Sequence, residues 1–199
     1  MIAFLAAVFF LLITPGPGVL SAAGVGAAFG FTAGARYILG LFIGTNLVAL
    51  AVMTGLATLI FANPAIRTIL SLLSVSYLIY LAYKIATAGG TVAIKAASRA
   101  PGIGDGITLQ AINPKAYVVN TALFSGFVIW PDMLGAEVLA KFVIVNAIWI
   151  PIHFLWLWLG ISIRRLDLGE RTQNRINYAM AAALLIVVAL AMRSVFIAG

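Results

Sequence analysis

Long apolar runs separated by short polar segments dominate the chain. A helix that crosses the hydrocarbon core of a bilayer needs about 20 predominantly apolar residues. The runs that meet this requirement are Ile2 to about Ala27, Tyr37–Phe61, about Ile66 to Tyr83, Ile107–Ile129, about Val138 to Ile163, and Tyr178–Ile197. The pattern predicts an all-α integral membrane protein with six transmembrane helices.

The segment between the third and fourth runs is small and polar, and it forms the main linker of the chain. It contains Gly89-Gly90 and Pro101-Gly102, and such pairs mark loops rather than helices. We therefore expect a first unit of three helices at 1–88, a cytoplasmic linker at 89–106, and a second unit of three helices at 107–199.

In two of the predicted spans, a helix-capping residue is followed by proline where a membrane helix would ordinarily continue. Thr14-Pro15-Gly16-Pro17-Gly18 interrupts the first span, and Asn113-Pro114-Lys115-Ala116 interrupts the fourth. A proline break can be only a kink between packed helices. However, threonine and asparagine are good helix N-caps, and proline is favoured at the first helical position after a cap. We therefore expect helices 1 and 4 to be broken near mid-membrane, with new half-helices beginning at Pro15 and Pro114.

The two halves of the chain carry the same landmarks in the same order. Thr14-Pro15 lies 99 residues before Asn113-Pro114, and Asn46 lies 100 residues before Asn146. Because each half contains three spans, an odd number, the second half must enter the membrane from the opposite side. We therefore expect two inverted three-helix repeats, an arrangement in which substrate sites lie near the midplane at broken helices.

Composition makes lipid the main solvent of the chain. Hydrophobic residues make up 64% of it and charged residues 9%, whereas a soluble domain is about one quarter charged. A soluble protein of this length could not bury so much apolar surface in its core. The chain contains no cysteine, which excludes disulfides and thiol redox chemistry.

The formal net charge is +7, which in a soluble protein would suggest a nucleic-acid partner. Here the basic residues are scattered between apolar runs, so we interpret them as orientation signals and expect no nucleic-acid binding. The loops after spans one, three and five hold eight Lys and Arg residues, against three on the opposite side, among them Lys141. The positive-inside rule then predicts a multi-pass protein of the cell inner membrane with both termini on the outer side. No basic residue precedes Arg36, so we expect the first run to be a retained span rather than a signal peptide.

The two breaks are candidate binding sites for an anion. A helix N-terminus carries free N–H groups and about half a positive charge, so two converging half-helices would attract a carboxylate. In the first break Gly16, Gly18 and Val19 would present the donors. In the second, Lys115 and Ala116 would do so, and the Lys115 side chain would add a full charge. The alternative for Lys115 is that it reaches the membrane surface or bonds carbonyl oxygens that the proline leaves free.

Other polar side chains in the spans have two interpretations each. Asn46 and Asn146 either bridge helices or offer a donor and an acceptor to an α-amino acid. The same two interpretations apply to Ser21 and Asn120. His153 is either a packed histidine or a proton carrier. With one histidine, and with no carboxylate and no metal-ligand cluster in the predicted spans, we expect no enzymatic activity, no bound metal and no cofactor.

At these residues the chain resembles the LysE/RhtB family of amino-acid exporters. The resemblance rests on four stretches in this order: Thr14-Pro15-Gly16-Pro17, the glycine-spaced Gly30 to Gly44, Tyr77 to Lys84, and Asn113-Pro114-Lys115-Ala116. Members of the family usually carry Asn after the second proline, where this chain has Gly18. The resemblance implies export of amino acids or related small metabolites from the cytoplasm, driven by the membrane potential or a proton gradient.

We therefore expect a secondary active exporter of an amino acid or amino-acid derivative. It would hold the substrate carboxylate at two half-helix N-termini and work by alternating access. The predicted substrate-binding residues are Thr14, Pro15, Gly16, Gly18, Asn46, Asn113, Pro114, Lys115 and Asn146, with His153 as the candidate for proton coupling.

Two other classes of membrane protein are alternatives. A passive channel would need a continuous polar lining, for which the spans have few side chains. A six-span electron carrier would need a thiol pair, which this chain lacks. The expected partners are a small-molecule substrate and the lipid bilayer, and the sequence is compatible with a homodimer.

Overall fold

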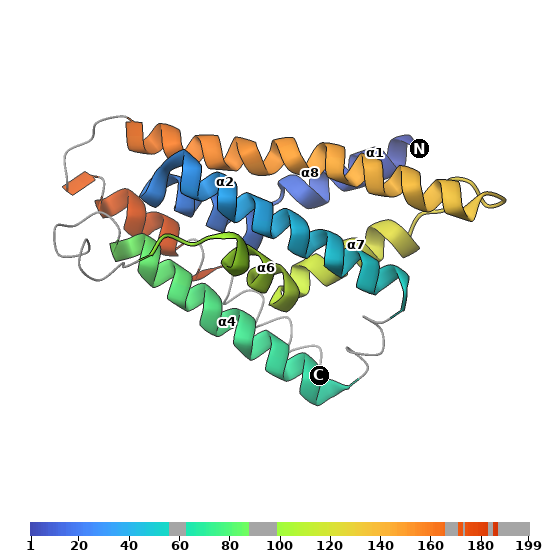
Figure 1. The fold of residues 1–199 in the computed structure, drawn as a ribbon, viewed down its shortest axis with the longest axis horizontal. Coiled ribbons are helices and arrows are strands. Elements are labelled where there is room, and N and C mark those ends of the chain that lie inside the picture. Colours follow the sequence, from blue (N-terminus) through green and yellow to red (C-terminus); the bar gives the residue numbers. More distant parts are fainter. Residues whose placement is uncertain (56–62, 88–98, 166–170, 173, 183–184, 187–199) are drawn as a thin grey trace.

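The computed structural model describes residues 1–55, 63–87, 99–165, 171–172, 174–182 and 185–186. All regular structure in these residues is helical, which confirms the all-α expectation. The helices are α1 (Ile2–Ile13), α2 (Pro17–Met53), α4 (Pro64–Thr87), α6 (Ile103–Ile112), α7 (Pro114–Ser125) and α8 (Leu134–Arg165) (Figure 1). Residues 174–182 are also helical, and the rest of the sixth predicted span lies almost entirely outside the described residues.

The chain reverses direction within α2, at Gly30. Gly30 has φ 81° and ψ −171°, a backbone conformation that glycine adopts far more readily than other residues. A Cβ atom built on Gly26 would lie 2.7 Å from Leu157 Cδ1, and one built on Gly34 would lie 2.1 Å from the same atom. In a straight helix these two glycines would be about 12 Å apart. The helix α2 therefore consists of two arms that fold together against α8 (Figure 1).

This reversal replaces the loop that the sequence predicts between spans one and two. The predicted first span ends near Ala27 and the second begins at Tyr37, whereas both residues lie inside α2. Arg36, which we assigned to a cytoplasmic loop, is an exposed residue of the second arm. Hydropathy does not detect this arrangement because the reversal depends on the φ angle of one glycine and not on polarity.

The helix α6 begins at Ile103, inside the segment predicted as a linker. The Asp105 carboxylate accepts a hydrogen bond of 2.8 Å from Gly102 N, which satisfies a free N–H at the helix start. Gly106 lies so close to α2 that a Cβ atom would be 2.5 Å from a backbone oxygen of that helix. A Cβ atom on Gly40 would lie 2.1 Å from the Ile103 oxygen. Glycines on both helices thus allow the backbones of α2 and α6 to pack directly.

Lys141 is buried, although the sequence analysis assigned it to an outer loop. It lies two turns into α8 with 2% of its side chain exposed, and its ammonium group contacts Glu137 Oε1 at 2.7 Å. It also donates hydrogen bonds to the backbone oxygens of Phe124, at 3.1 Å, and of Phe127. The loop assignment is wrong because Lys141 lies in α8, where its cation supplies donors to carbonyl oxygens at the end of α7 and just beyond it.

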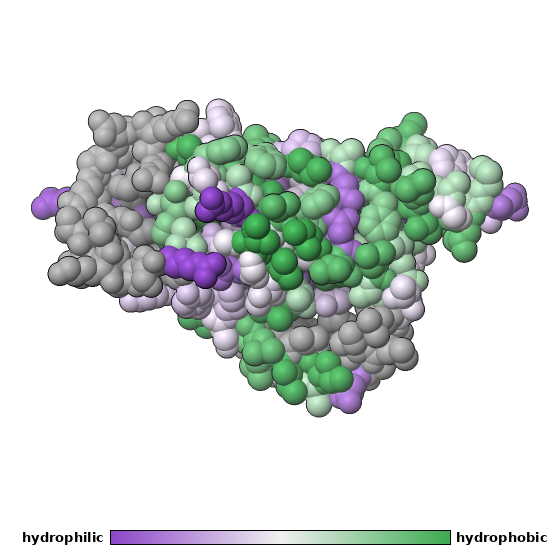
Figure 2. Space-filling view, in the orientation of Figure 1, coloured by the Kyte–Doolittle hydropathy of each residue, from purple (hydrophilic) through white to green (hydrophobic). Residues whose placement is uncertain are grey.

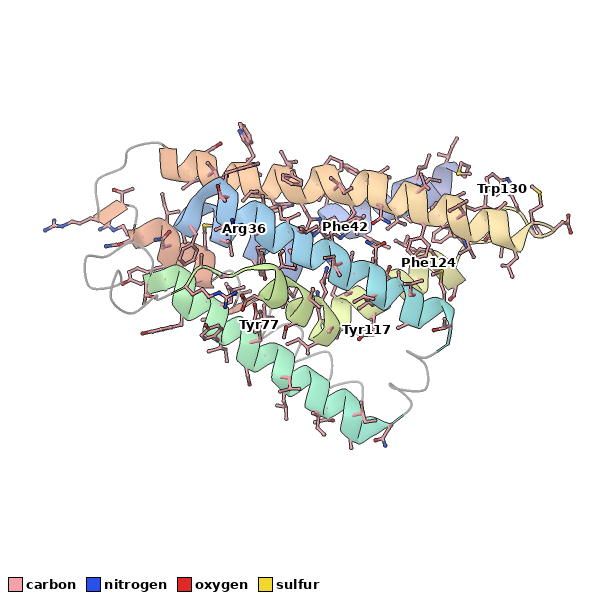
Figure 3. The ribbon with its side chains drawn as sticks, viewed as in Figure 1. Arg36, Phe42, Tyr77, Tyr117, Phe124 and Trp130 are labelled. Atoms are coloured by element: carbon pink, nitrogen blue, oxygen red, sulfur yellow. The ribbon has the colours of Figure 1, made fainter. Side chains whose placement is uncertain are left out.

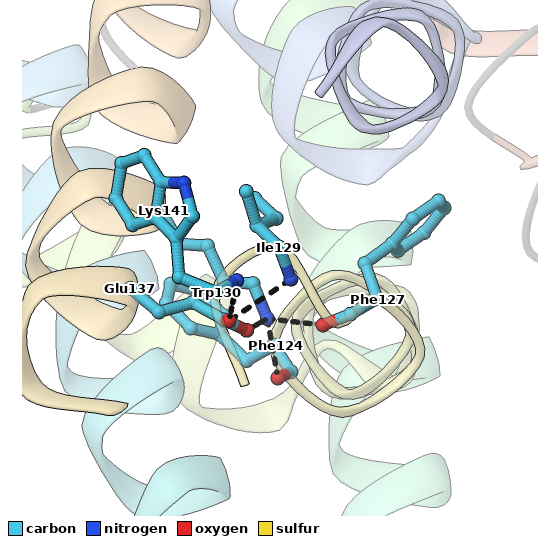
Figure 4. Close-up of polar contacts among 6 residues, drawn as sticks. All are labelled: Phe124, Phe127, Ile129, Trp130, Glu137 and Lys141. Atoms are coloured by element: carbon cyan, nitrogen blue, oxygen red, sulfur yellow. Dashed lines mark hydrogen bonds and ion pairs between the residues drawn. The ribbon is translucent and has the colours of Figure 1, made fainter. Parts of the chain in front are cut away.

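Glu137 completes the connection between α7 and α8. Its Oε2 accepts hydrogen bonds from the backbone N–H groups of Ile129, at 2.9 Å, and Trp130, at 2.6 Å (Figure 4). In the segment that joins α7 to α8, Glu137 thus accepts from backbone N–H groups and Lys141 donates to a backbone carbonyl oxygen.

Apolar side chains are exposed over a large part of the surface. Figure 2 shows hydrophobic residues spread across the visible face, and Val118, Val128 and Leu134 are among the most exposed. Within the described residues, two helices are long and apolar enough to cross a membrane, Pro17–Met53 and Leu134–Ile163. In Figure 3, Trp130 lies at one end of the long axis, whereas Arg36 lies nearer the middle of the molecule.

Candidate functional site

The two proline breaks meet in space. Lys115 Nζ, at the second break, donates a hydrogen bond of 2.7 Å to the backbone oxygen of Thr14, at the first, although the two residues are 101 positions apart. A cavity lies at this junction and is lined by residues of α1, α2, α6, α7 and α8. The structure therefore brings together the two stretches that the sequence analysis singles out.

The first break differs from the predicted geometry. Thr14 caps the C-terminus of α1, because its N and Oγ1 donate to Phe10 O at 3.2 Å and 2.5 Å. Gly16 is extended, with φ −164° and ψ 178°, and α2 begins at Pro17. The predicted start at Pro15 is wrong because Gly16 precedes a second proline, and a residue before proline is disfavoured in the helical conformation. Thr14 thus ends one half-helix instead of starting the next.

The N-terminus of α2 presents backbone donors at the cavity. The first N–H groups of a helix have no intrahelical partner, and Pro17 has no N–H. The donors of the first turn are therefore the N–H groups of Gly18 and Val19, and both residues line the cavity together with Gly16. The partial positive charge of the helix N-terminus adds to the attraction for an anion.

The second break begins a helix as the sequence predicts, with Asn113 as the N-cap and Pro114 as the first residue of α7. Asn113 Oδ1 accepts from Lys115 N at 3.1 Å, and Asn113 O accepts from Ala116 N at 3.0 Å. The expectation that these two N–H groups are free is therefore wrong, because the cap residue itself satisfies them. The second break contributes to the cavity through the Lys115 side chain rather than through its backbone.

The cavity combines polar and apolar walls. Its volume is about 50 Å³, which is enough to hold water. None of the described residues that line it is acidic, and this part of the chain contains no group of three or more His, Asp or Glu that could hold a metal ion. The polar side chains at the cavity are those of Thr14, Thr45, Gln110, Asn113, Lys115, Asn120 and His153. Pro15 and Pro114 shape the two breaks but are not among the lining residues.

His153 lies on α8 opposite the first turn of α2. It is 3% exposed, and its ring stacks on the indole of Trp149, with centroids 3.5 Å apart and planes inclined by 16°. Its Nδ1 contacts Trp149 O at 2.9 Å. A Cβ atom built on Gly18 would lie 3.4 Å from His153 Nε2, so the imidazole faces the backbone of the first break directly.

Asn46 and Asn146 bind each other. Asn46 Nδ2 donates to Asn146 Oδ1 at 3.1 Å, and Asn146 Nδ2 donates to Asn46 Oδ1 at 2.8 Å. Neither residue lines the cavity. Of the two interpretations that the sequence leaves open, the geometry favours the bridge, here between α2 and α8.

Besides apolar residues, the lining includes Thr45, Gln110 and Trp149, which were not predicted from the sequence, and two further residues, Ser21 and Asn120, were left with open roles. Gln110 precedes Asn113 by one turn and therefore shares its helix face, a signal that could have identified it. Nothing comparable in the sequence marks Thr45 or Trp149 as lining residues. Of the two left open, Ser21 Oγ donates to Gly18 O at 2.8 Å and Asn120 Nδ2 donates to Ala116 O at 2.7 Å. Only Asn120 reaches the cavity.

Comparison with models of protein families gives a match over most of the chain. The family model described as LysE type translocator matches residues 9–194, a range that includes both breaks and every residue lining the cavity. No curated protein and no solved structure matches the chain.

Proposed function

The chain belongs to the LysE type translocator family, and on this basis we propose that it is a secondary active exporter of an amino acid or amino-acid derivative. Family membership makes it a membrane transport protein. The observation that carries the proposed substrate is the junction of the two breaks, where helix N-terminal N–H groups and a lysine ammonium group share one cavity. Both kinds of group attract carboxylates.

In the proposed complex, the substrate carboxylate binds between the N–H groups of Gly18 and Val19 and the ammonium group of Lys115. An ammonium group has three donors, of which Thr14 O accepts one in this structure. An ammonium group inside a membrane is costly unless it is paired or used, and a carboxylate would neutralise it. Glycine at positions 16 and 18 allows the ligand to approach the backbone closely.

Alternating access depends on the same lysine. The bond from Lys115 to Thr14 ties α7 to the end of α1, and a carboxylate that binds Lys115 competes with that tie. In the proposed transport cycle, the two halves are inverted repeats that then move relative to each other around the site. It is supported by the Asn46–Asn146 pair, because residues at equivalent positions contact each other at a two-fold axis.

We place the protein in the cell inner membrane with both termini on the outer side, as the distribution of Lys and Arg predicts. Transport would be driven by the membrane potential or a proton gradient. His153 is the candidate proton carrier, since it is the lining side chain whose ordinary titration lies nearest neutral pH. A homodimer is compatible with this topology.

Counterflow in proteoliposomes tests the proposed function. Vesicles loaded with a mixture of unlabelled amino acids are expected to take up a labelled amino acid faster than empty vesicles do, and the uptake should saturate. Lys115→Gln is expected to abolish most of this flux, whereas Arg36→Gln, which removes an exposed cation outside the cavity, should preserve it. Flux without saturation and without trans-stimulation would indicate a passive channel and contradict the exporter.

A further inference from the structure

One ring nitrogen of His153 has no partner and opens into the cavity. The residue is 3% exposed and forms part of the cavity wall. Its Nδ1 is occupied by Trp149 O, at 2.9 Å, and Nε2 has no hydrogen-bond partner among the described residues. Nε2 is not among the fully buried side-chain atoms that lack a partner in the described residues. It is therefore accessible, and because His153 lines the cavity, we expect a molecule in the cavity to supply its partner.

The contact with Trp149 determines what kind of partner Nε2 requires. A carbonyl oxygen can only accept a hydrogen bond, so Nδ1 carries the proton and Nε2 of the neutral ring is an acceptor. Stacking on the Trp149 indole, with centroids 3.5 Å apart, holds the ring in one orientation. The imidazole therefore presents a fixed lone pair, which suits a hydrogen-bond donor such as an ammonium group.

Among the described residues that line the cavity, His153 Nε2 is the strongest hydrogen-bond acceptor available to an ammonium group. None of the others is acidic, and Lys115 can only donate. Gln110 Oε1 already accepts from Asn113 Nδ2 at 3.1 Å. Thr45 and Asn120 offer neutral oxygen atoms, which are less basic than an imidazole nitrogen.

Gly18 places this acceptor next to the donors proposed for the carboxylate. A Cβ atom at position 18 would lie 3.4 Å from His153 Nε2, so the imidazole and the Gly18 backbone are immediate neighbours. An α-amino acid carries its ammonium and carboxylate groups on one carbon atom. The two groups can therefore occupy the two neighbouring positions at the same time.

We propose that His153 Nε2, which Gly18 leaves open to the cavity, accepts a hydrogen bond from the α-ammonium group of the substrate. The inference rests on the proposed function and adds a second recognition point to its carboxylate site. It makes the substrate an α-amino acid rather than a simple carboxylic acid, with His153 as the residue that distinguishes the two.

Paired ligands test this inference on the purified protein in detergent. The probes are alanine, leucine and lysine, each paired with the analogue that lacks the α-amino group: propionate, 4-methylpentanoate and 6-aminohexanoate. The dissociation constants follow from ligand-induced shifts of the thermal unfolding midpoint. The unmodified protein is expected to prefer the amino acid by about tenfold or more, the usual scale for a hydrogen bond to a charged group.

Two substitutions separate the role of Nε2 from the role of the ring in packing. His153→Asn retains a donor near Trp149 O but has no atom at the Nε2 position, whereas His153→Gln places an amide near that position. We expect His153→Asn to bind the analogues as before and to lose about tenfold in affinity for the amino acids. His153→Gln should recover part of the preference. Gly18→Ala should also reduce the preference, because its methyl group contacts Nε2.

Each outcome decides between the two proposals. If the unmodified protein prefers an amino acid and His153→Asn keeps that preference, the inference is overturned and the exporter proposal stands. Equal weakening of amino acid and analogue in His153→Asn would assign the residue a structural role and also overturn the inference. If the unmodified protein binds no α-amino acid, the proposed function itself is contradicted, and the inference with it.

Discussion

The Lys115 ammonium group donates a hydrogen bond of 2.7 Å to the backbone oxygen of Thr14 and so joins two breaks that lie 101 residues apart. The same side chain lines the cavity between them. Thr14 ends one half-helix, and Lys115 lies in the first turn of another. The hydrogen bond between the two breaks and the proposed carboxylate site thus depend on a single cation.

Removing this cation is expected to weaken carboxylate binding. Lys115→Gln keeps a polar side chain of similar length but removes the charge, so the charge-assisted contact to the carboxylate is lost. We expect the dissociation constants of alanine and of propionate to rise together, by about tenfold or more. Ligand-induced shifts of the unfolding midpoint measure both constants. An unchanged affinity for propionate would place the carboxylate elsewhere.

Gly16 sets the space that the Lys115 side chain occupies. A Cβ atom on Gly16 would lie 2.8 Å from Lys115 Cδ and 2.9 Å from Nζ, so Gly16→Ala must displace the lysine from Thr14 O. We expect counterflow to fall severalfold. Gly104→Ala is the matched control, since its Cβ atom would meet nothing within 4 Å and alanine is the better helix former. Equal loss of flux in both variants would argue against a specific role of Gly16.

The Asn46–Asn146 pair is expected to stabilise the protein without touching the substrate. Each asparagine both donates to and accepts from the other, and such bonds between membrane helices are worth about 1 kcal/mol. Asn46→Ala and Asn146→Ala should each lower the unfolding midpoint, and the double variant should lower it by less than the two effects combined. Amino-acid affinity should not change in any of the three. A loss of affinity would return these residues to the binding site.

Lys141 is expected to matter for stability, although it lies outside the cavity. Lys141→Met leaves Glu137 Oε1 without its ion-pair partner and leaves the backbone oxygens of Phe124 and Phe127 without their donor. Breaking a buried ion pair is strongly destabilising, and we expect the unfolding midpoint to fall on the order of 5 °C or more. Asp132→Asn, an exposed charge in the same connection, is the control that should remain near the original midpoint.

The positions of the breaks could be predicted from the sequence because their cause is local. Proline cannot continue a helix, and an asparagine followed by proline begins one, so the start of α7 at Pro114 follows from two adjacent residues. The start of α2 was misplaced by two residues. Pro17 disfavours the helical conformation at Gly16, and this effect, although it is also local, was not included in the predicted start.

The features that could not be predicted depend on contacts between distant residues. The reversal at Gly30 requires Gly26 and Gly34 to pack on Leu157 of α8, and hydropathy contains no information about that contact. Lys141 resembles a loop residue until the end of α7 is known to lie within its reach. His153 could be named as a candidate from its residue type, but its orientation depends on Trp149 and Gly18 together.

Substrate protection of a single cysteine tests the location of the site most directly. The chain contains no cysteine, so Thr45→Cys introduces one thiol at the cavity wall, and Asp132→Cys introduces one at an exposed position outside it. We predict that the amino acid identified by counterflow slows the labelling of Thr45→Cys severalfold by a thiol reagent and leaves Asp132→Cys unaffected. If Thr45→Cys still transports and is labelled at the same rate with and without the amino acid, the substrate binds elsewhere and the account is contradicted.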